Sequence, residues 1–343
     1  MEQRFFFLSH HMPRDGYGYG GLRIIDALWE LGALVEPVDM LDEDHTYTQF
    51  GSSTWTVRGP ALALCVPEWW GDIVAERLVG STMFEATRMP AGRVEAINGT
   101  ADVCLVPCEW CREMFVEQGV RVPVRVVRWG IDPGDYYPLE RDQTLRQAQG
   151  KPYTFLWSGT PDKRKGWDLV YRAFWKAFGH NKDAKLVLRF RKLPRCLSGC
   201  NDENVEIVEG LLNRPGMRRL LQEADCFVFP SRGEGWGLPP REAAATGLPA
   251  IVTNWSGLTE ELEHWGLPVD VAGLEPAEFG GWEKGQVGEW AVPDLDHLVW
   301  QMRWCFENRE FAAQAGENAA AWLAEHATWE RTARGVLEVM QGC

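Results

Sequence analysis

Short apolar runs alternate with stretches of helical periodicity along the first part of the chain. The apolar runs predict buried strands at 4–8, 33–38, 61–66, 102–107 and 124–129. Apolar positions spaced three and four residues apart predict helices at 22–31, 93–98 and 109–118, and a glycine follows the first and the last of these. Strands that alternate with helices are typical of parallel, doubly wound sheets.

The alternation stops over 137–151, a polar stretch that contains Pro138 and Gly150, and then begins again. Further strands are predicted at 153–158, 184–190, 205–208, 226–230 and 250–253, and helices at 165–178, 216–223 and 239–246. From Leu295 to the end the pattern is helical. The polar stretch therefore reads as a connection between two domains.

This organisation predicts an α/β protein with two Rossmann-like domains, each built on a doubly wound parallel sheet. The expected bounds are 1–145 for the first domain and 146–325 for the second. A C-terminal helical tail over 326–343 can cross back to the first domain. The length of 343 residues agrees with two or three domains.

Composition and charge narrow the class of protein. Hydrophobic residues make up 45% of the chain and charged residues 24%, as in ordinary soluble domains. The net charge of −14 argues against a protein that coats nucleic acid or an anionic membrane through its overall field. No window reaches the roughly eighteen apolar residues of a membrane span, and the apolar run 5–8 is too short for a signal peptide. We therefore expect a cytoplasmic protein.

The cysteines give no sign of a metal site. Nine cysteines, an odd number, argue against a full set of disulfides. The pairs Cys108/Cys111 and Cys196/Cys200 have the spacing of half a zinc site. A structural zinc site needs four converging ligands, whereas these pairs lie far apart in the chain. We expect free thiols and no bound metal.

The segment Pro230–Pro249 carries the strongest chemical pattern. A buried strand is expected to end at Pro230, and glycines at 233, 235 and 237 then let backbone N–H groups approach a ligand closely. The two prolines that follow fit the first turn of a helix. Because the N-terminus of that helix points at the loop, the segment forms a ready site for phosphate.

Two carboxylates flank this phosphate site. Glu234 lies on the loop, and Glu242 lies about one turn into the helix, with seven residues between them. The layout fits a ligand with an anionic middle and hydroxyls at both ends, such as a nucleotide-diphosphate sugar. The alternative is a generic strand–loop–helix with a charged helix face.

The segment resembles the Glu-x7-Glu signature of retaining GT-B glycosyltransferases, family 4 in particular. The similarity extends to the segments 107–115, 124–132, 155–167 and 220–231, and residues 80–265 can be matched as a whole. The resemblance implies a GT-B fold, in which two Rossmann-like domains face a cleft. The first domain would lie on the acceptor side, and the second would bind the nucleotide-sugar donor.

The resemblance also implies a role for each matching position. Glu242 should bind the donor ribose hydroxyls, Glu234 should contact the transferred sugar, and Lys165 should neutralise the departing diphosphate. Glu234 and Lys165 are therefore the expected catalytic residues. The backbone that should meet the diphosphate or the sugar belongs to Gly235, Trp236, Gly237 and Leu238. No metal or other cofactor is required, because cationic side chains and a helix dipole supply the positive charge.

The chain departs from the family pattern just before the lysine–glycine loop. The family often has an arginine there as a second phosphate partner, whereas this chain has Ser158 and Gly159. Arg164 or Arg189 can substitute for it, and we place Ser158, Gly159 and Arg164 among the donor-binding residues. Outside this context the basic run 163–165 would be a solvated charge run.

Acceptor-side candidates come from the first domain. The glycine-rich turn 16–21 follows a strand and opens a helix, so its N–H groups can face the cleft. The residues that we place there are Gly18, Tyr19, Gly20 and His10, the last at the end of the first strand. Glu85 and Arg88 are the polar candidates where related enzymes place a histidine, with a structural salt bridge as the equal alternative.

These features predict a metal-independent hexosyltransferase that transfers a hexose from a UDP- or GDP-sugar to a hydroxyl acceptor with retention of configuration. We expect a saccharide or glycoconjugate acceptor. The alternatives are glycosylation of a hydroxymethylated DNA base and a nucleotide-sugar-binding protein without turnover. A dinucleotide oxidoreductase shares the Gly-x-Gly-x-x-Gly spacing at 16, 18 and 21, but this motif does not directly follow the first strand. The sequence leaves open the acceptor, the choice of UDP or GDP, the base and the oligomeric state.

Overall fold

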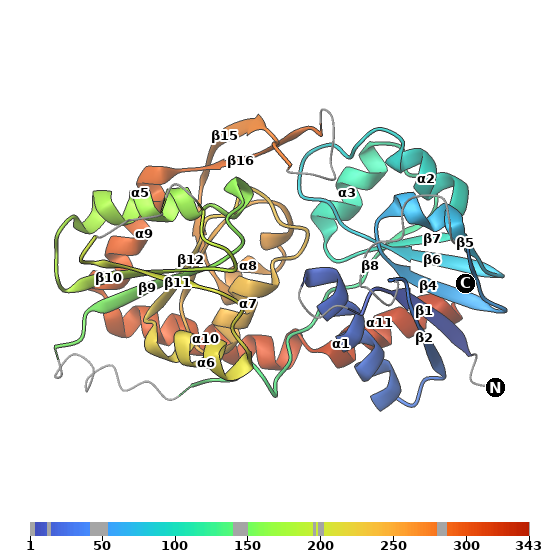
Figure 1. The fold of residues 1–343 in the computed structure, drawn as a ribbon, viewed down its shortest axis with the longest axis horizontal. Coiled ribbons are helices and arrows are strands. Elements are labelled where there is room, and N and C mark those ends of the chain that lie inside the picture. The colour runs from blue at the N-terminus through green and yellow to red at the C-terminus, as the bar shows by residue number, and fades with distance from the viewer. Residues whose placement is uncertain are drawn as a thin grey trace. The chain divides into compact units, whose positions relative to one another are not determined.

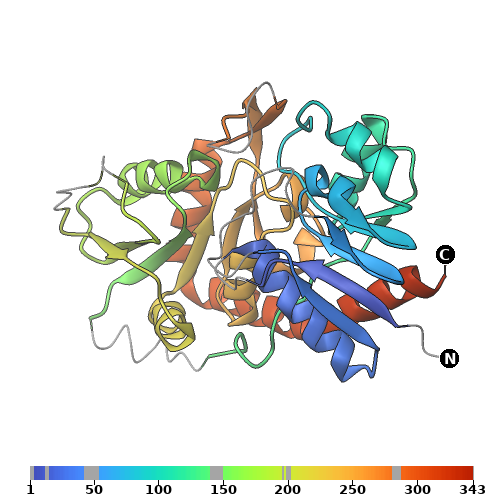
Figure 2. The same cartoon turned by 45° about the vertical axis from the view of Figure 1, so that its right-hand side comes forward.

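Two six-stranded parallel sheets organise the computed structural model, which describes residues 4–11, 15–41, 54–139, 150–194, 197, 202–279 and 287–342. The chain divides into two units, shown in Figures 1 and 2. The first unit comprises Met1–Asp132, Glu283–Gly288 and Ala327–Cys343, and the second comprises Pro133–Trp282 and Glu289–His326. The α/β architecture predicted from the alternating pattern is confirmed.

The sheet of the first unit has the strand order β2-β1-β4-β6-β7-β8, and every neighbouring pair is parallel. Its strands are β1 (Phe5–Ser9), β2 (Val35–Asp39), β4 (Pro60–Leu64), β6 (Arg77–Ser81), β7 (Val103–Val106) and β8 (Val124–Val126). All residues of β4 and β7 are buried, as expected for continuous apolar runs in a sheet that is covered on both faces. The short strands β3 (Trp55–Thr56) and β5 (Ile73–Val74) pair with each other.

The helices of the first unit include the C-terminal helix of the chain. They are α1 (Gly16–Glu30), α2 (Arg93–Thr100), α3 (Glu109–Glu117), α11 (Trp329–Gln341) and the 3-10 helix η1 (Pro67–Asp72). Helix α11 packs along α1, and Thr332 Oγ1 donates a hydrogen bond to Arg128 O at 2.7 Å. Ile131 N likewise donates to Ala327 O at 2.7 Å. The last helix is thus tied to the segment that follows β8.

The glycine-rich segment 16–21 is helical, so the prediction of a turn there was wrong. Helix α1 begins at Gly16, and the Asp15 side chain caps it by accepting a hydrogen bond from Gly18 N at 3.0 Å. A Cβ atom on Gly20 would lie 2.6 Å from the Trp129 ring, and one on Gly21 would lie 2.9 Å from Ser9 Oγ. The cap and this close packing outweigh the low helix propensity of glycine.

The sheet of the second unit has the order β11-β10-β9-β12-β13-β14, again wholly parallel. Its strands are β9 (Tyr153–Gly159), β10 (Ala184–Phe190), β11 (Val205–Glu209), β12 (Cys226–Phe229), β13 (Ala250–Thr253) and β14 (Leu267–Val269). The chain runs outward from β9 to β11 and then returns to β12 on the other side of β9. The strand order therefore reverses between β9 and β12, and ligands of open α/β sheets bind at the carboxyl ends of the strands at such a point.

Helices cover both faces of the second sheet. They are α5 (Trp167–Phe178), α6 (Arg214–Glu223), α7 (Leu238–Ala245), α8 (Leu262–Trp265), α9 (Leu295–Glu307) and α10 (Arg309–His326). Because crossover connections are right-handed, α5 lies on one face, and α6 and α7, whose connections run in the opposite direction, lie on the other. Helix α9 packs on α5, and α10 packs on α7.

Several elements differ from the prediction. The helix expected at 165–178 is divided, because Gly166 has a φ of 70° between the 3-10 helix η2 (Lys163–Lys165) and α5. Strands β6 and β14 were not predicted, nor was the antiparallel hairpin of β15 (Val271–Pro276) and β16 (Glu289–Pro293). The other predicted strands and helices are present, with ends displaced by a few residues.

Candidate active site

The loop after β12 and the start of α7 form the strand–loop–helix that the sequence predicted. Strand β12 ends at Phe229, and α7 begins at Leu238 with proline in its first turn. Gly237 caps the helix with a φ of 87°, in the left-handed region that favours glycine. The first backbone N–H groups of α7 therefore point toward the loop that contains Glu234.

Glu234 is the centre of a buried charge cluster, which we call the Glu234 cluster and define as Glu234, Lys165, Arg164 and Ser231. The Glu234 residue is only 5% exposed. Lys165 Nζ lies 2.8 Å from both of its carboxylate oxygens, Arg164 Nη1 donates to Oε1 at 3.1 Å, and Ser231 Oγ donates to Oε1 at 2.8 Å. Two cations thus surround one carboxylate, which leaves a net positive charge.

The electrostatics of the Glu234 cluster favour the ionised carboxylate. Burial alone raises the pKa of the Glu234 carboxyl, but Lys165, Arg164 and the Ser231 hydroxyl together hold that pKa below its usual value. Glu234 therefore stays negatively charged at neutral pH, and it holds the Lys165 ammonium in place. An incoming anion would compete with Glu234 for the same ammonium.

A second loop fixes the backbone of Glu234. Ser256 Oγ accepts a hydrogen bond from Glu234 N at 2.9 Å, and Gly257 N donates to Glu234 O at 2.9 Å. Ser256 is fully buried and has a φ of 54°, which is unusual for a residue other than glycine. Such backbone strain persists only where the surrounding structure determines it, and it clusters at functional sites.

The loop after β9 places Lys165. Asp162 caps η2 by accepting a hydrogen bond from Arg164 N at 2.8 Å, and Trp157 Nε1 donates to Lys165 O at 3.0 Å. Gly166 packs directly on the Pro230 carbonyl, where a side chain would not fit. The two loops that flank the switch point are thus locked together, and Lys165 is held against Glu234.

Arg232 connects this site to neighbouring elements. The residue is 5% exposed, and its guanidinium donates to both carboxylate oxygens of Asp168 on α5, at 3.0 and 2.9 Å, and to Glu275 on β15 at 3.0 Å. The Arg232 backbone accepts a hydrogen bond from Ala291 N on β16 at 2.9 Å. No local sequence pattern indicated this function of Arg232, because Asp168 and Glu275 lie far from it in the chain.

Arg241 on α7 is a second buried arginine that organises the site. Its guanidinium lies 3.9 Å from the ring centroid of Trp236 and 4.3 Å from that of Trp265. It donates to Trp236 O, to Gly257 O at 3.0 Å and to Glu260 O at 3.1 Å. Arg241 therefore joins the glycine loop, which carries Glu234, to the loop that contains Gly257 and Glu260, and no local sequence pattern identified it.

The other predicted donor residues lie at the carboxyl edge of the same sheet. Glu242 lies in α7 with a half-buried side chain. Ser158, 6% exposed, and Gly159 are the last residues of β9. Arg189 pairs in register with Ser158 from the neighbouring strand β10. The structure thus brings Glu234, Lys165 and Arg164 into contact and places the remaining residues on the surrounding strands and helix.

The predicted acceptor-side residues lie in the first unit. His10 is buried, with Nε2 at 3.3 Å from Asp15 Oδ1. Gly18 and Gly20 are buried and Tyr19 is half-buried in the first turns of α1. Glu85 is half-buried and Arg88 is exposed.

Tyr17 lies beside these residues in the first turn of α1. Its hydroxyl lies 3.2 Å from Thr82 Oγ1 and accepts a hydrogen bond from Met83 N at 3.2 Å. Burial raises the pKa of the Tyr17 phenol. Tyr17 therefore joins α1 to the segment after β6 as a neutral side chain.

The described residues contain no group of three or more histidine, cysteine, aspartate or glutamate side chains arranged to hold a metal ion. Cys108 and Cys111 are buried free thiols, and burial raises the pKa of Cys111. Cys196 and Cys200 lie outside the described residues. None of the helices in the described part of the chain has the length and apolar character that crossing a membrane requires.

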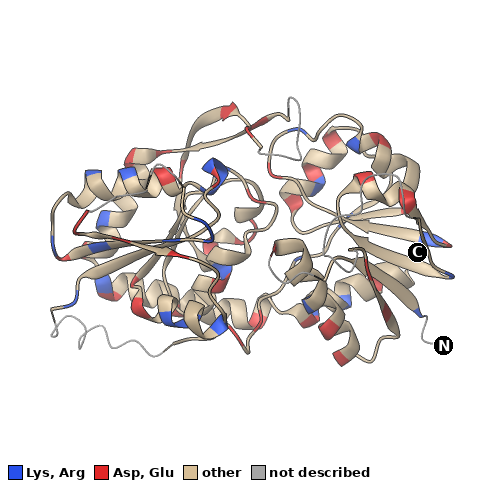
Figure 3. Ribbon diagram, in the orientation of Figure 1, with Lys and Arg blue, Asp and Glu red and all other residues tan. Residues whose placement is uncertain are grey.

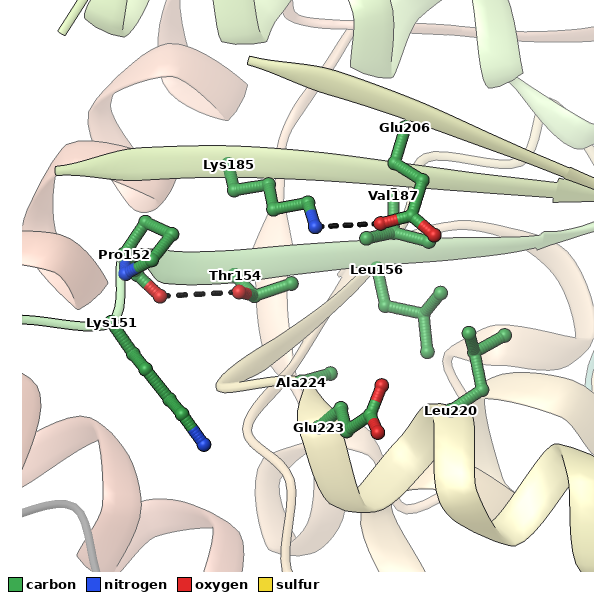
Figure 4. Close-up of a pocket in the computed structure, with 10 residues that line it drawn as sticks. All are labelled: Lys151, Pro152, Thr154, Leu156, Lys185, Val187, Glu206, Leu220, Glu223 and Ala224. Carbon is green, nitrogen blue, oxygen red and sulfur yellow. Dashed lines mark hydrogen bonds and ion pairs between the residues drawn. The ribbon is translucent and has the colours of Figure 1, made fainter. Parts of the chain in front are cut away.

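A separate cavity of about 240 Å³ lies between α6 and the second sheet. Thr154 and Lys185, near the starts of β9 and β10, line it together with Leu220 of α6 (Figure 4). Lys185 forms an ion pair with Glu206 at 2.6 Å across its wall. The cavity lies at the amino ends of the strands, away from the carboxyl edge where the Glu234 cluster is found.

Solved structures with this fold are GT-B glycosyltransferases, so the chain has the GT-B fold. A sucrose-phosphate synthase from Thermosynechococcus elongatus has a TM-score of 0.73, with 16% identity and coverage of 99% of this chain and 98% of its own. Anabaena HepE, solved in complex with UDP-glucose, has a TM-score of 0.69, with 15% identity and coverage of 99% and 100%. At these identities the similarity shows the fold alone.

The chain belongs to the family described as "Family 4 Glycosyltransferase in conflict systems", whose model matches residues 108–336. It is also 25% identical over 270 residues to the D-inositol 3-phosphate glycosyltransferase of Paenarthrobacter aurescens, which corresponds to 74% of this chain and 60% of that relative. The chain thus spans less than two thirds of the length of this curated relative.

Proposed function

We propose that this glycosyltransferase moves a hexose from a UDP- or GDP-sugar to a hydroxyl acceptor, with retention of configuration. The observation that carries the proposal is the Glu234 cluster beside the N-terminus of α7. A net positive cluster and a helix N-terminus both favour the diphosphate of a nucleotide sugar. The proposal also draws on the solved neighbour that binds UDP-glucose and on membership of family 4.

In the proposed reaction, the Glu234 cluster would stabilise negative charge on the leaving group. As the bond between the sugar and the diphosphate breaks, charge grows on the phosphate oxygens, and Lys165 and the first N–H groups of α7 would neutralise it. Glu234 would then be free to contact the sugar, and Glu242 would bind the ribose hydroxyls. A donor phosphate oxygen would accept the proton of the attacking hydroxyl. This assignment requires no metal ion.

We propose a saccharide or glycoconjugate as the acceptor. Two relatives are described as a D-inositol 3-phosphate glycosyltransferase and a lipopolysaccharide core mannosyltransferase, and both descriptions name hydroxyl-rich acceptors. His10, Glu85 and Arg88 are the side chains that we assign to the acceptor side. DNA that contains hydroxymethylated bases belongs in the same acceptor screen, because the donor chemistry would be identical.

Release of nucleoside diphosphate tests the proposed function. We expect Lys165→Ala and Glu242→Ala to lose at least about 100-fold of the transfer rate, because each removes a group that binds the donor or its leaving group. Lys176→Ala and Glu263→Ala are matched controls, since Lys176 and Glu263 are exposed residues of α5 and α8. They should keep the wild-type rate.

The comparison requires folded variants, which thermal unfolding verifies. Full activity in both Lys165→Ala and Glu242→Ala would refute the site. Binding of nucleotide sugars without any release of nucleoside diphosphate, across a panel of saccharide and DNA acceptors, would instead indicate a binding protein without turnover.

A further inference from the structure

Arg189 is a buried cation at the carboxyl end of β10 that no carboxylate neutralises among the described residues. It is 7% exposed. Its Nη2 donates to Gly210 O at 2.8 Å, and its Nε is buried without a hydrogen-bond partner. Burial lowers the pKa of the Arg189 guanidinium, and the neighbouring Arg191 lowers it further. The guanidinium thus has more hydrogen-bond donors than the surrounding protein uses.

Arg232, in the same unit, is an arginine of similar burial whose charge is compensated within the protein. Arg232 donates to two carboxylates, those of Asp168 and Glu275, whereas Arg189 donates to one carbonyl. Removing a charge from water is unfavourable unless partners compensate it. Among the described residues no carboxylate gives Arg189 such compensation, and an acceptor on a bound ligand can supply it.

The surroundings of Arg189 match the predicted donor site. Arg189 is in register with Ser158, so both side chains lie on the same face of the sheet. The right-handed connections place α6 and α7 on one face of the sheet. Leu220 of α6 lines a cavity with Val187 and Leu156, which identifies their face as this one. Arg189 and Ser158 lie two residues further along the same strands and so point to the same face. Arg189 therefore shares the face of α7, which carries Glu242.

Strand spacing decides which part of a nucleotide Arg189 can reach. The loop that would hold the diphosphate follows β12, and β10 is two strands away in the order β10-β9-β12. Two strand spacings amount to about 10 Å. The Arg189 guanidinium donates to Gly210 O, which follows β11, and β11 lies on the side of β10 away from that loop. The nucleoside of a nucleotide bound at that loop can extend over this distance of about 10 Å to reach Arg189.

We propose that Arg189 is a specificity-determining residue that donates a hydrogen bond to a carbonyl oxygen of the donor's base. Uracil and guanine carry such an oxygen, and adenine does not, so the site should select UDP or GDP over ADP. Guanidinium groups recognise keto bases in this way elsewhere, most often through O6 and N7 of guanine. The inference rests on the proposed function, since it assumes a nucleotide donor.

Calorimetric titration of the full chain with UDP, GDP, ADP and inorganic pyrophosphate tests this inference. We expect the wild type to bind UDP or GDP about 10-fold more tightly than ADP. Arg189→Lys and Arg189→Met should both reduce this preference below about 3-fold by weakening the binding of UDP or GDP. Methionine cannot donate a hydrogen bond, and lysine keeps the charge but lacks the planar fork of the guanidinium. Arg191→Gln, an exposed neighbour that removes the same charge, should behave like the wild type.

The pyrophosphate titration separates the alternatives. Unchanged pyrophosphate affinity in the Arg189 variants supports the assignment to the base and also shows that the variants are folded. An equal loss for pyrophosphate, ADP and the keto nucleotides would overturn it in favour of a phosphate contact, and an unchanged preference would overturn it outright. If the methionine variant does not fold, the lysine variant decides. A wild type that binds none of the nucleotides would overturn the proposed function as well.

Discussion

Glu234 and its two cations are the residues on which the account depends. The carboxylate is buried, and its stabilisation comes from Lys165 and Arg164 rather than from water. Burial of a single carboxylate without such partners would raise its pKa and neutralise it. Glu234 therefore stays ionised because both cations are present, and removal of the Glu234 carboxylate leaves their charges uncompensated.

The pKa of Glu234 gives a pH-dependent prediction for stability. Its folded-state pKa lies below the unfolded value of about 4.5, so the unfolded state binds more protons in that range. The carboxylate therefore contributes stability above about pH 4.5, and this contribution is lost as the pH falls through the lower folded-state pKa. We expect the free energy of unfolding of the wild type to fall more steeply below pH 4.5 than that of Glu234→Gln.

Urea denaturation at a series of pH values between about 3 and 7 measures this difference. Glu263→Gln, at an exposed carboxylate of α8, is the control and should follow the wild type. Parallel curves for the wild type and Glu234→Gln would contradict the assignment of a depressed pKa to Glu234.

At the scale of elements, α7 and the loops around it act as one unit. Arg241 lies between two tryptophan rings and donates to main-chain carbonyls of three different residues. We expect Arg241→Met to lower the free energy of unfolding by about 2 kcal/mol, because these buried carbonyls lose their donors. The same variant should raise the KM for the donor several-fold, since the backbone of Trp236 and Gly237 is no longer held in place.

Arg241→Lys distinguishes positioning from charge alone. Lysine keeps the charge but lacks the planar fork and its stacking on the tryptophans, so it should not restore the donor KM. Arg303→Met, which removes an arginine from the exposed side of α9, is the control. A wild-type donor KM in both Arg241 variants would show that Arg241 has no part in positioning the loop.

The elements also show how far the sequence could lead. The glycine and proline spacing around 233–240 predicted the loop and α7, because each residue type has a local conformational reason to be there. The segment 16–21 was predicted as a turn but is helical. Two of its glycines are there for close packing against Trp129 and Ser9, and the local spacing of glycines does not reveal such packing. Strand β6 has polar ends, Arg77 and Ser81, and was missed. The contact partners of Arg232 and Arg241 come from distant segments, so no local pattern predicted them.

At the scale of the whole molecule, charge is distributed unevenly. The chain has a net charge of −14, yet the Glu234 cluster is positive, and none of the described carboxylates pairs with Arg189. Figure 3 shows basic positions among acidic ones on the helices and strands of each unit. Binding of a nucleotide diphosphate therefore depends on local groups and not on the overall field, which would repel an anion.

A crystal structure of the chain with UDP or GDP bound is the most direct measurement of the central claim. Our account predicts phosphate oxygens within hydrogen-bonding distance of Lys165 Nζ and of the first backbone N–H groups of α7, with the ribose hydroxyls at Glu242. A nucleotide bound elsewhere on the chain, with Lys165 still paired only to Glu234, would contradict it.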